Sequence, residues 1–186
     1  MNINEIIEKA AVIVGREDVG RFINNDKTEI FEDTEYTLKT FLSLLNLVIQ
    51  ELAATFIPMY KKETVVTKNG VARFADLSFT AMEIVGVYDL DGNAITYEFT
   101  PEYIKVDRAQ IVIEYEIVPP NYELGQNVDY TEKQVPCVIL AYGLVAEYYV
   151  NTGRFEQAVS WHKRYVDAIN SLRKTKNVKC KSRSFV

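Results

Sequence analysis

The 186-residue sequence has few of the residues that build metal sites and covalent frameworks. It contains one histidine, His162, and two cysteines, Cys137 and Cys180, in no Cys-x-x-Cys or Cys–His spacing. A zinc site and a disulfide framework are therefore not expected, and the cysteine usage fits a reducing compartment. The eight glycines are dispersed and form no phosphate-binding loop. We expect neither a metal nor a cofactor.

Long apolar runs are also missing. No run approaches the roughly 20 residues that a membrane-spanning helix needs, so we expect no membrane partner. Glu5 and Glu8 stand where a secretory signal would have a basic start and an uninterrupted apolar stretch, and we therefore interpret the N-terminus as mature sequence. The composition, with 48% hydrophobic and 25% charged residues, is that of a folded globular protein.

Charge is unevenly distributed along the chain. The 21 basic and 26 acidic residues give a net charge of −5, which disfavours a generic grip on nucleic acid. Residues 173–186 hold six of the basic residues and no acidic one, so residues 1–172 carry 15 against 26, a net charge of −11. We call residues 173–186 the arm. The arm has no regular apolar pattern, and we expect it to be disordered alone and to order on a partner, unless it is only a solubilising end. Its cations are Arg173, Lys174, Lys176, Lys179, Lys181 and Arg183.

The first third of the chain has the periodicity of helices. Apolar residues spaced three and four apart predict a helix that Asn4 caps and Gly15 ends, followed by a helical turn at residues 19–23. A longer amphipathic helix is predicted from Asp33 or Thr34 to about residue 55. Residues 1–60 are therefore predicted to be N-terminal helices.

The period changes to two at Lys61, and residues 61–118 are predicted to form an antiparallel β insertion of about six strands. Asn69-Gly70 and Asp91-Gly92 predict the turns of two hairpins, and residues 107–109 predict the turn of a third, between strands at residues 103–106 and 110–117.

The last third returns to the helical period. A helix starting at Pro136 and a second one from Arg154 to about Lys174 are separated by a break at residues 151–153. Residues 119–172 should therefore form a helical hairpin that packs with residues 1–60 as one core. The segregation of helices from strands predicts an α+β fold.

Side chains that could carry catalysis are few. His162 has no Ser or Cys nucleophile at a recognisable spacing, and we interpret it as a surface or interface residue. Glu114 and Glu116 share one face of a strand, as an acid/base pair could, although paired carboxylates on a solvated sheet face are common. We expect the protein not to be an enzyme and to have no catalytic residues.

One segment partly matches a calcium-binding loop. Its matching positions are Asp89, Asp91, Gly92 and Glu98. Val87 stands where the first ligand should be, and the flanks read as strands, so we interpret the segment as a hairpin turn.

Aromatic residues crowd the predicted C-terminal hairpin. Tyr and Trp are enriched at interface hot spots, so we consider a role between subunits, the alternative being that the hairpin packs on its own chain. The candidate interface residues are Tyr148, Tyr149, Phe155, Trp161 and Tyr165.

The hairpin sequence, VPCVILAYGLVAEYYVNTGRFEQAVSWHKRYVDAINSLRK, resembles the C-terminal helical pair of tailed-bacteriophage head-to-tail adaptor (connector) proteins. In that family a small-residue helix and a short turn precede a helix with the pattern A-x-x-W/Y-x-x-x-Y-x-x-A. The matching positions here are Ala158, Trp161, Tyr165 and Ala168. The likeness covers about 40 residues, and the rest of the chain is similar in architecture only.

The resemblance implies a structural protein of the virion neck, made in the host cytoplasm. Its copies would form a twelve-fold ring beneath the portal protein, through which genomic DNA passes without specific binding, and a tail or second neck protein would attach to it. The arm would then bind the portal through its six cations and Phe185.

Two other classes of protein remain open. A nucleic-acid-binding accessory protein would use the basic arm, and its affinity for DNA would fall steeply with salt. A small enzyme with an unrecognised carboxylate site would hold Glu114 or Glu116 in a concave pocket.

Overall fold

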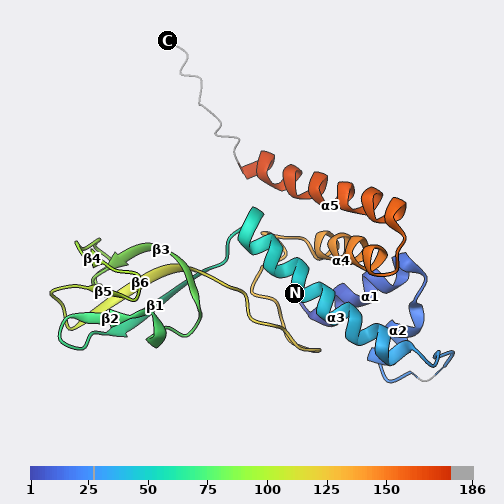
Figure 1. Ribbon diagram of the computed structural model, residues 1–186, viewed down its shortest axis with the longest axis horizontal. Helices are drawn as coiled ribbons and strands as arrows, with labels where there is room; N and C mark the ends of the chain where they lie inside the picture. Colours follow the sequence, from blue (N-terminus) through green and yellow to red (C-terminus); the bar gives the residue numbers. More distant parts are fainter. Residues whose placement is uncertain (27, 177–186) are drawn as a thin grey trace, which may run out of the picture. The chain divides into compact units, whose positions relative to one another are not determined.

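The computed structural model describes residues 1–26 and 28–176, with side chains described as far as Leu172. The chain forms two compact units. One contains Met1–Ile49 and the chain from Asn121 onward, and the other contains Gln50–Pro120. The described residues form five α-helices and six strands in two antiparallel sheets, which confirms the predicted α+β class (Figure 1).

The first unit is helical. Its helices are α1 (Ile3–Val14), α2 (Glu17–Ile23), α3 (Thr34–Glu51), α4 (Cys137–Asn151) and α5 (Phe155–Lys176). Gly15 ends α1 in the left-handed conformation, as predicted. The predicted cap of α1 was wrong: Asn2 caps the helix by accepting a hydrogen bond from the Asn4 N–H, at 2.8 Å. The Asn4 side chain accepts instead from the Gly125 N–H at 2.9 Å, and so ties α1 to the segment before α4.

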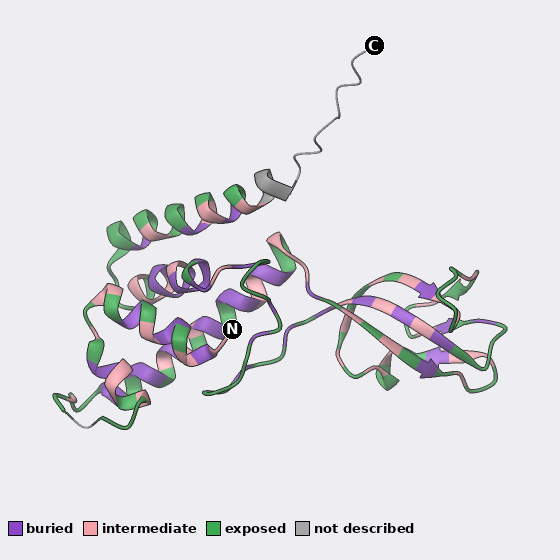
Figure 2. Cartoon of the chain, turned by 180° about the vertical axis from the view of Figure 1, so that it is seen from behind, coloured by how far each residue is buried: buried purple, intermediate pink, exposed green. Residues whose placement is uncertain are grey.

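Helix α4 lies at the centre of the helical unit, against both α1 and α5. Buried positions occur on several of its sides, because neighbouring helices cover much of its surface. Figure 2 shows buried positions throughout α1, α3 and α4, whereas α5 is exposed along much of its length. Gly143 of α4 allows the closest approach, since a Cβ there would lie 2.6 Å from Val48 and 3.1 Å from the Tyr165 ring.

Asn46 of α3 holds the segment that leads into α4. Its side-chain amide donates to the Tyr122 carbonyl at 3.0 Å, and its amide oxygen accepts from the Tyr122 N–H at 2.7 Å. Both bonds are buried, so Asn46 satisfies two peptide groups that would otherwise lack partners.

The second unit is mostly β-structure and contains the predicted insertion, residues 61–118. The chain enters it through η1, a π-helical turn (Leu52–Phe56) that continues α3. Its strands are β1 (Tyr60–Val66), β2 (Val71–Arg73), β3 (Ala81–Tyr88), β4 (Glu98–Phe99), β5 (Tyr103–Lys105) and β6 (Gln110–Ile117), with the 3₁₀ turn η2 (Phe74–Asp76) after β2. The sheet orders are β1-β6-β3 and β2-β5-β4.

The predicted pairing of neighbouring strands into three hairpins was wrong. Asn69 and Gly70 do form the tight turn, with φ of 54° and 75°, but only Lys68 and Val71 pair across it. Beyond the turn β1 pairs with β6, and β2 pairs with β5.

The other two predicted hairpins fail in the same way. Strand β3 pairs with β6, and only a single bridge, between Tyr88 and Ala94, forms at the second turn. Strands β5 and β6 follow each other in the chain but belong to different sheets. The strand β6 buries every second residue, which explains its central place between β1 and β3.

Candidate interaction surface on the C-terminal helices

The first flank of the α4–α5 hairpin is lined with half-buried aromatic rings. Tyr142 of α4 and Trp161 of α5 are in contact, with ring centroids 5.4 Å apart, and the Arg164 guanidinium lies 4.6 Å above the Trp161 ring. Arg154 lies 6.0 Å from the centroid of the Tyr149 ring. We call these five residues the aromatic flank. A cation over an aromatic face is stabilising, and here it leaves the guanidinium at the surface.

The second flank is an apolar groove of about 520 Å³ between α4 and α5. Val150, Phe155 and Val159 expose 47%, 64% and 71% of their surface, which is unusual for three large apolar residues in one depression. The apolar groove also has polar groups at its rim: Glu147, His162, Lys163 and Asp167. Its remaining apolar lining is Ala146, Ala158 and Val166.

The predicted interface residues fall in different environments. Phe155 lies in the apolar groove, and Tyr149 and Trp161 lie on the aromatic flank. Tyr148 packs edge to face against Phe41 of α3, with ring centroids 4.9 Å apart, so much of its contact is internal. Tyr165 is 1% exposed and is a core residue, which corrects its assignment as a surface candidate.

The predicted portal-binding arm is described only in part. Helix α5 extends to Lys176, so Arg173, Lys174 and Lys176 belong to its last two turns, which corrects the expected start of the irregular segment. The other predicted contacts, Lys179, Lys181, Arg183 and Phe185, lie outside the described residues.

Glu114 and Glu63, two carboxylates of the β unit, have structural partners. Glu114 lies 4.0 Å from Lys62, whose ammonium is 4.4 Å from the centroid of the Tyr88 ring. The sequence did not single out Glu63, which accepts a hydrogen bond from the Tyr115 hydroxyl at 2.9 Å. Burial and the neighbouring Glu63 carboxylate raise the pKa of Tyr115 to about 12. Burial alone would raise the pKa of Glu63, but hydrogen bonds from Ser78 and Tyr115 lower it below its usual value.

The segment that partly matches a calcium loop is a turn held by Asp89. The Asp89 carboxylate accepts from the N–H groups of Asp91 and Asn93, at 3.0 and 2.8 Å. Glu98 points to a different partner, Lys105, at 3.5 Å. Within residues 1–26 and 28–176, no group of three or more His, Cys, Asp or Glu side chains is placed to hold a metal ion.

Cys137 is buried at the start of α4. Burial raises the pKa of its thiol, and this effect exceeds the opposing influence of Lys9. A protonated, enclosed thiol is a small apolar core residue and a poor nucleophile.

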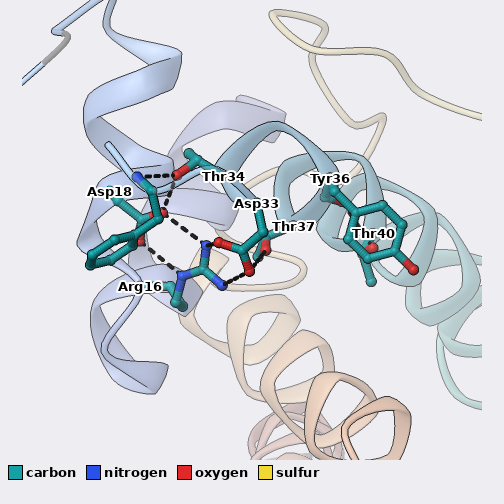
Figure 3. A network of polar contacts seen from close by, with 8 residues as sticks. Arg16, Asp18, Asp33, Thr34, Tyr36, Thr37 and Thr40 are labelled. Atoms are coloured by element: carbon teal, nitrogen blue, oxygen red, sulfur yellow. Dashed lines mark hydrogen bonds and ion pairs between the residues drawn. The ribbon is translucent and has the colours of Figure 1, made fainter. Parts of the chain in front are cut away.

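A polar network at the junction of α2 and α3 was not predicted from the sequence (Figure 3). Arg16 donates to Asp18 at 2.9 Å and to Asp33 at 3.0 Å, and the Thr34 hydroxyl also donates to Asp18. Asp18 is 3% exposed. Burial would raise its pKa, but the hydrogen bonds from Arg16 and Thr34 lower it below its usual value, so the carboxylate stays charged.

The sequence matches no protein-family model and no curated protein. In the described part of the chain, none of the helices combines the length and the apolar character that a membrane crossing requires.

Proposed function

We propose that this chain is a structural virion protein, a head-to-tail adaptor. Its copies assemble as a ring beneath the portal, genomic DNA passes through the ring, and tail components attach to it. The observation that carries the proposal is the α4–α5 hairpin. The segment that resembles the adaptor family is also the one that exposes an aromatic flank and an apolar groove.

The two surfaces have the composition of protein interfaces. Trp, Tyr and Arg are the side chains most enriched at interface hot spots, and the aromatic flank consists of these three types. Large apolar side chains in a concave depression lose contact with water when a partner covers them, which favours association.

The distribution of charge also supports the proposal. Residues 1–172 have a net charge of −11, and an acidic channel wall would not retain DNA, because phosphate binding relies on cations that release counterions. The cations of the arm are suited to an acidic groove on the portal, where each contact would be charge-assisted.

Deletion of the part of the arm that follows α5 tests the proposal. Because α5 extends to Lys176, the deletion should begin at residue 177 and leave the helix whole. We expect the truncated chain to keep the thermal stability of the full chain, and a virus that carries it to accumulate DNA-filled heads without tails. Electron microscopy of lysates and complementation by the full-length gene provide the measurement.

A full-length variant serves as the matched control for the deletion. In it, Lys179→Gln, Lys181→Gln and Arg183→Gln remove the three cations that follow Lys176 but keep the length of the arm. This variant should also fail to join heads to tails if charge-assisted contacts hold the arm. Normal virions from the truncated chain would contradict the docking role. Tight, steeply salt-dependent DNA binding that is lost on truncation would favour the nucleic-acid-binding class instead.

A further inference from the structure

The aromatic flank and the apolar groove lie on opposite sides of one hairpin. Val159 and Trp161 are two positions apart on α5, so their side chains point about 200° apart around the helix. Val159 lines the apolar groove, whereas Trp161 contacts Tyr142 on the aromatic flank. Each chain therefore presents the concave apolar groove on one side of the hairpin and aromatic side chains on the other.

The charges of the two surfaces are complementary. The aromatic flank carries Arg154 and Arg164, and the rim of the apolar groove carries Glu147 and Asp167 beside a single lysine, Lys163. In the part of the chain that the structure describes, neither arginine forms an ion pair, and neither of the two acids does. The two arginines on the aromatic flank and the two acids at the rim of the apolar groove are therefore available to a partner.

We propose that the aromatic flank of one copy docks into the apolar groove of a second copy, head to tail. The proposal rests on the self-assembly of the proposed function and identifies the two surfaces that carry it. Rings of Tyr142 and Trp161 would cover Val150, Phe155 and Val159, and the two arginines would face Glu147 and Asp167. A docked pair leaves one aromatic flank and one apolar groove free, so the contact repeats and closes into a ring when the rotation allows.

A groove-to-groove contact is less favourable. Two concave surfaces leave space between them, and such a contact would bring the acidic rim residues of both copies together. The aromatic flank instead supplies rings of large area and charges of the opposite sign.

Charge reversal on each surface tests the contact. The first variant combines Arg154→Glu with Arg164→Glu, and the second combines Glu147→Lys with Asp167→Lys. Each variant alone opposes like charges across every contact, and we expect self-association about tenfold weaker or more than that of the wild-type chain. In a 1:1 mixture the two variants can alternate, and each contact between them then brings opposite charges together. The mixture should regain the wild-type association.

Sedimentation velocity over a range of protein concentrations measures the association, and circular dichroism verifies the fold of each variant. The control for the first variant combines Lys68→Glu with Lys133→Glu, which changes the net charge equally at exposed sites off both surfaces. It should associate like the wild-type chain.

Each of three results would overturn the inference: a wild-type chain that is monomeric at every concentration, reversal variants that associate normally, or a mixture that does not recover. Unchanged association of the first variant alone would indicate a groove-to-groove contact. None of these results refutes the adaptor proposal, since a portal can template a ring. That proposal fails if the protein is absent from the neck of the virion.

Discussion

Replacement of Gly143 by alanine should destabilise the helical unit, against the usual effect of this substitution in a helix. The new Cβ would lie 2.6 Å from Cγ1 of Val48 and 3.1 Å from the Tyr165 ring, where ordinary contacts are about 3.5–4.0 Å. Both neighbours are buried, and Val48 is β-branched and therefore stiff. Neither can yield without disturbing the core.

The magnitude follows from two opposing effects. Overpacking of a filled core costs about 1–3 kcal/mol, and alanine gains about 1 kcal/mol over glycine in helix propensity. We expect Gly143→Ala to lower the free energy of unfolding by about 1 kcal/mol. Gly20→Ala in α2 is the matched control, because its Cβ would meet only Glu8, at an ordinary 3.6 Å. That variant should be more stable than the wild-type chain, by up to about 1 kcal/mol.

Urea unfolding followed by the fluorescence of Trp161, the single tryptophan, measures both variants in the helical unit. The double variant Val48→Ala with Gly143→Ala provides a further test, because loss of the valine methyls makes room for the new Cβ. The double variant should lose about 1 kcal/mol less free energy of unfolding than the two single variants lose in sum. A Gly143→Ala variant as stable as the wild-type chain would refute this account of the α3–α4–α5 packing.

Two further predictions concern buried groups. Arg16→Met should cost about 3 kcal/mol, because it leaves the buried Asp18 carboxylate without its cation. Since the folded-state pKa of Asp18 is lowered, the stabilisation is present above the unfolded value of about 3.9 and is lost as the pH falls through the folded value. Thermal melts of the wild-type chain between pH 2 and 6 should show this loss, and a wild-type profile that is flat there would contradict it. Cys137 should resist alkylation in the folded chain at pH 8 and react on unfolding, as peptide mass spectrometry can measure; rapid labelling of the folded chain would contradict its enclosure.

The helices could be predicted from the sequence because their signals are local. Gly15 ends α1 in the left-handed conformation, as the pattern indicated, and α4 begins at Cys137, one residue after the predicted start at Pro136. The cap of α1 was misplaced by two residues, since both Asn2 and Asn4 can cap and the choice depends on Gly125, 121 positions away. The extent of α5 was also underestimated.

Strand pairing could not be predicted because it depends on contacts between distant residues. The dipeptide Asn69-Gly70 determines the turn, but the partner of β1 is chosen by burial of the alternating apolar residues of β6, more than 40 positions later. The network of Arg16, Asp18 and Asp33 was not predicted from the sequence for a related reason. Alternating charges near helix ends are common, and only the fold shows that Asp18 is enclosed.

The apolar groove could be predicted from the sequence only in part. Phe155 and Val159 could be assigned to α5, but the helical pattern alone does not show that they stay exposed. On the other flank, Tyr165 follows the same pattern as Trp161 and yet lies in the core, because Gly143 opens a space for its ring.

The pair of hydrogen bonds between Asn46 and Tyr122 has a consequence for how such a chain can diverge. It fastens together the two points between which the 71-residue unit Gln50–Pro120 departs and returns, using only residues of the helical unit. The helical unit therefore closes its own structure at the point where the second unit is inserted. Evolution can exchange, shorten or extend the inserted unit to match a new partner without disturbing the core of the helical unit.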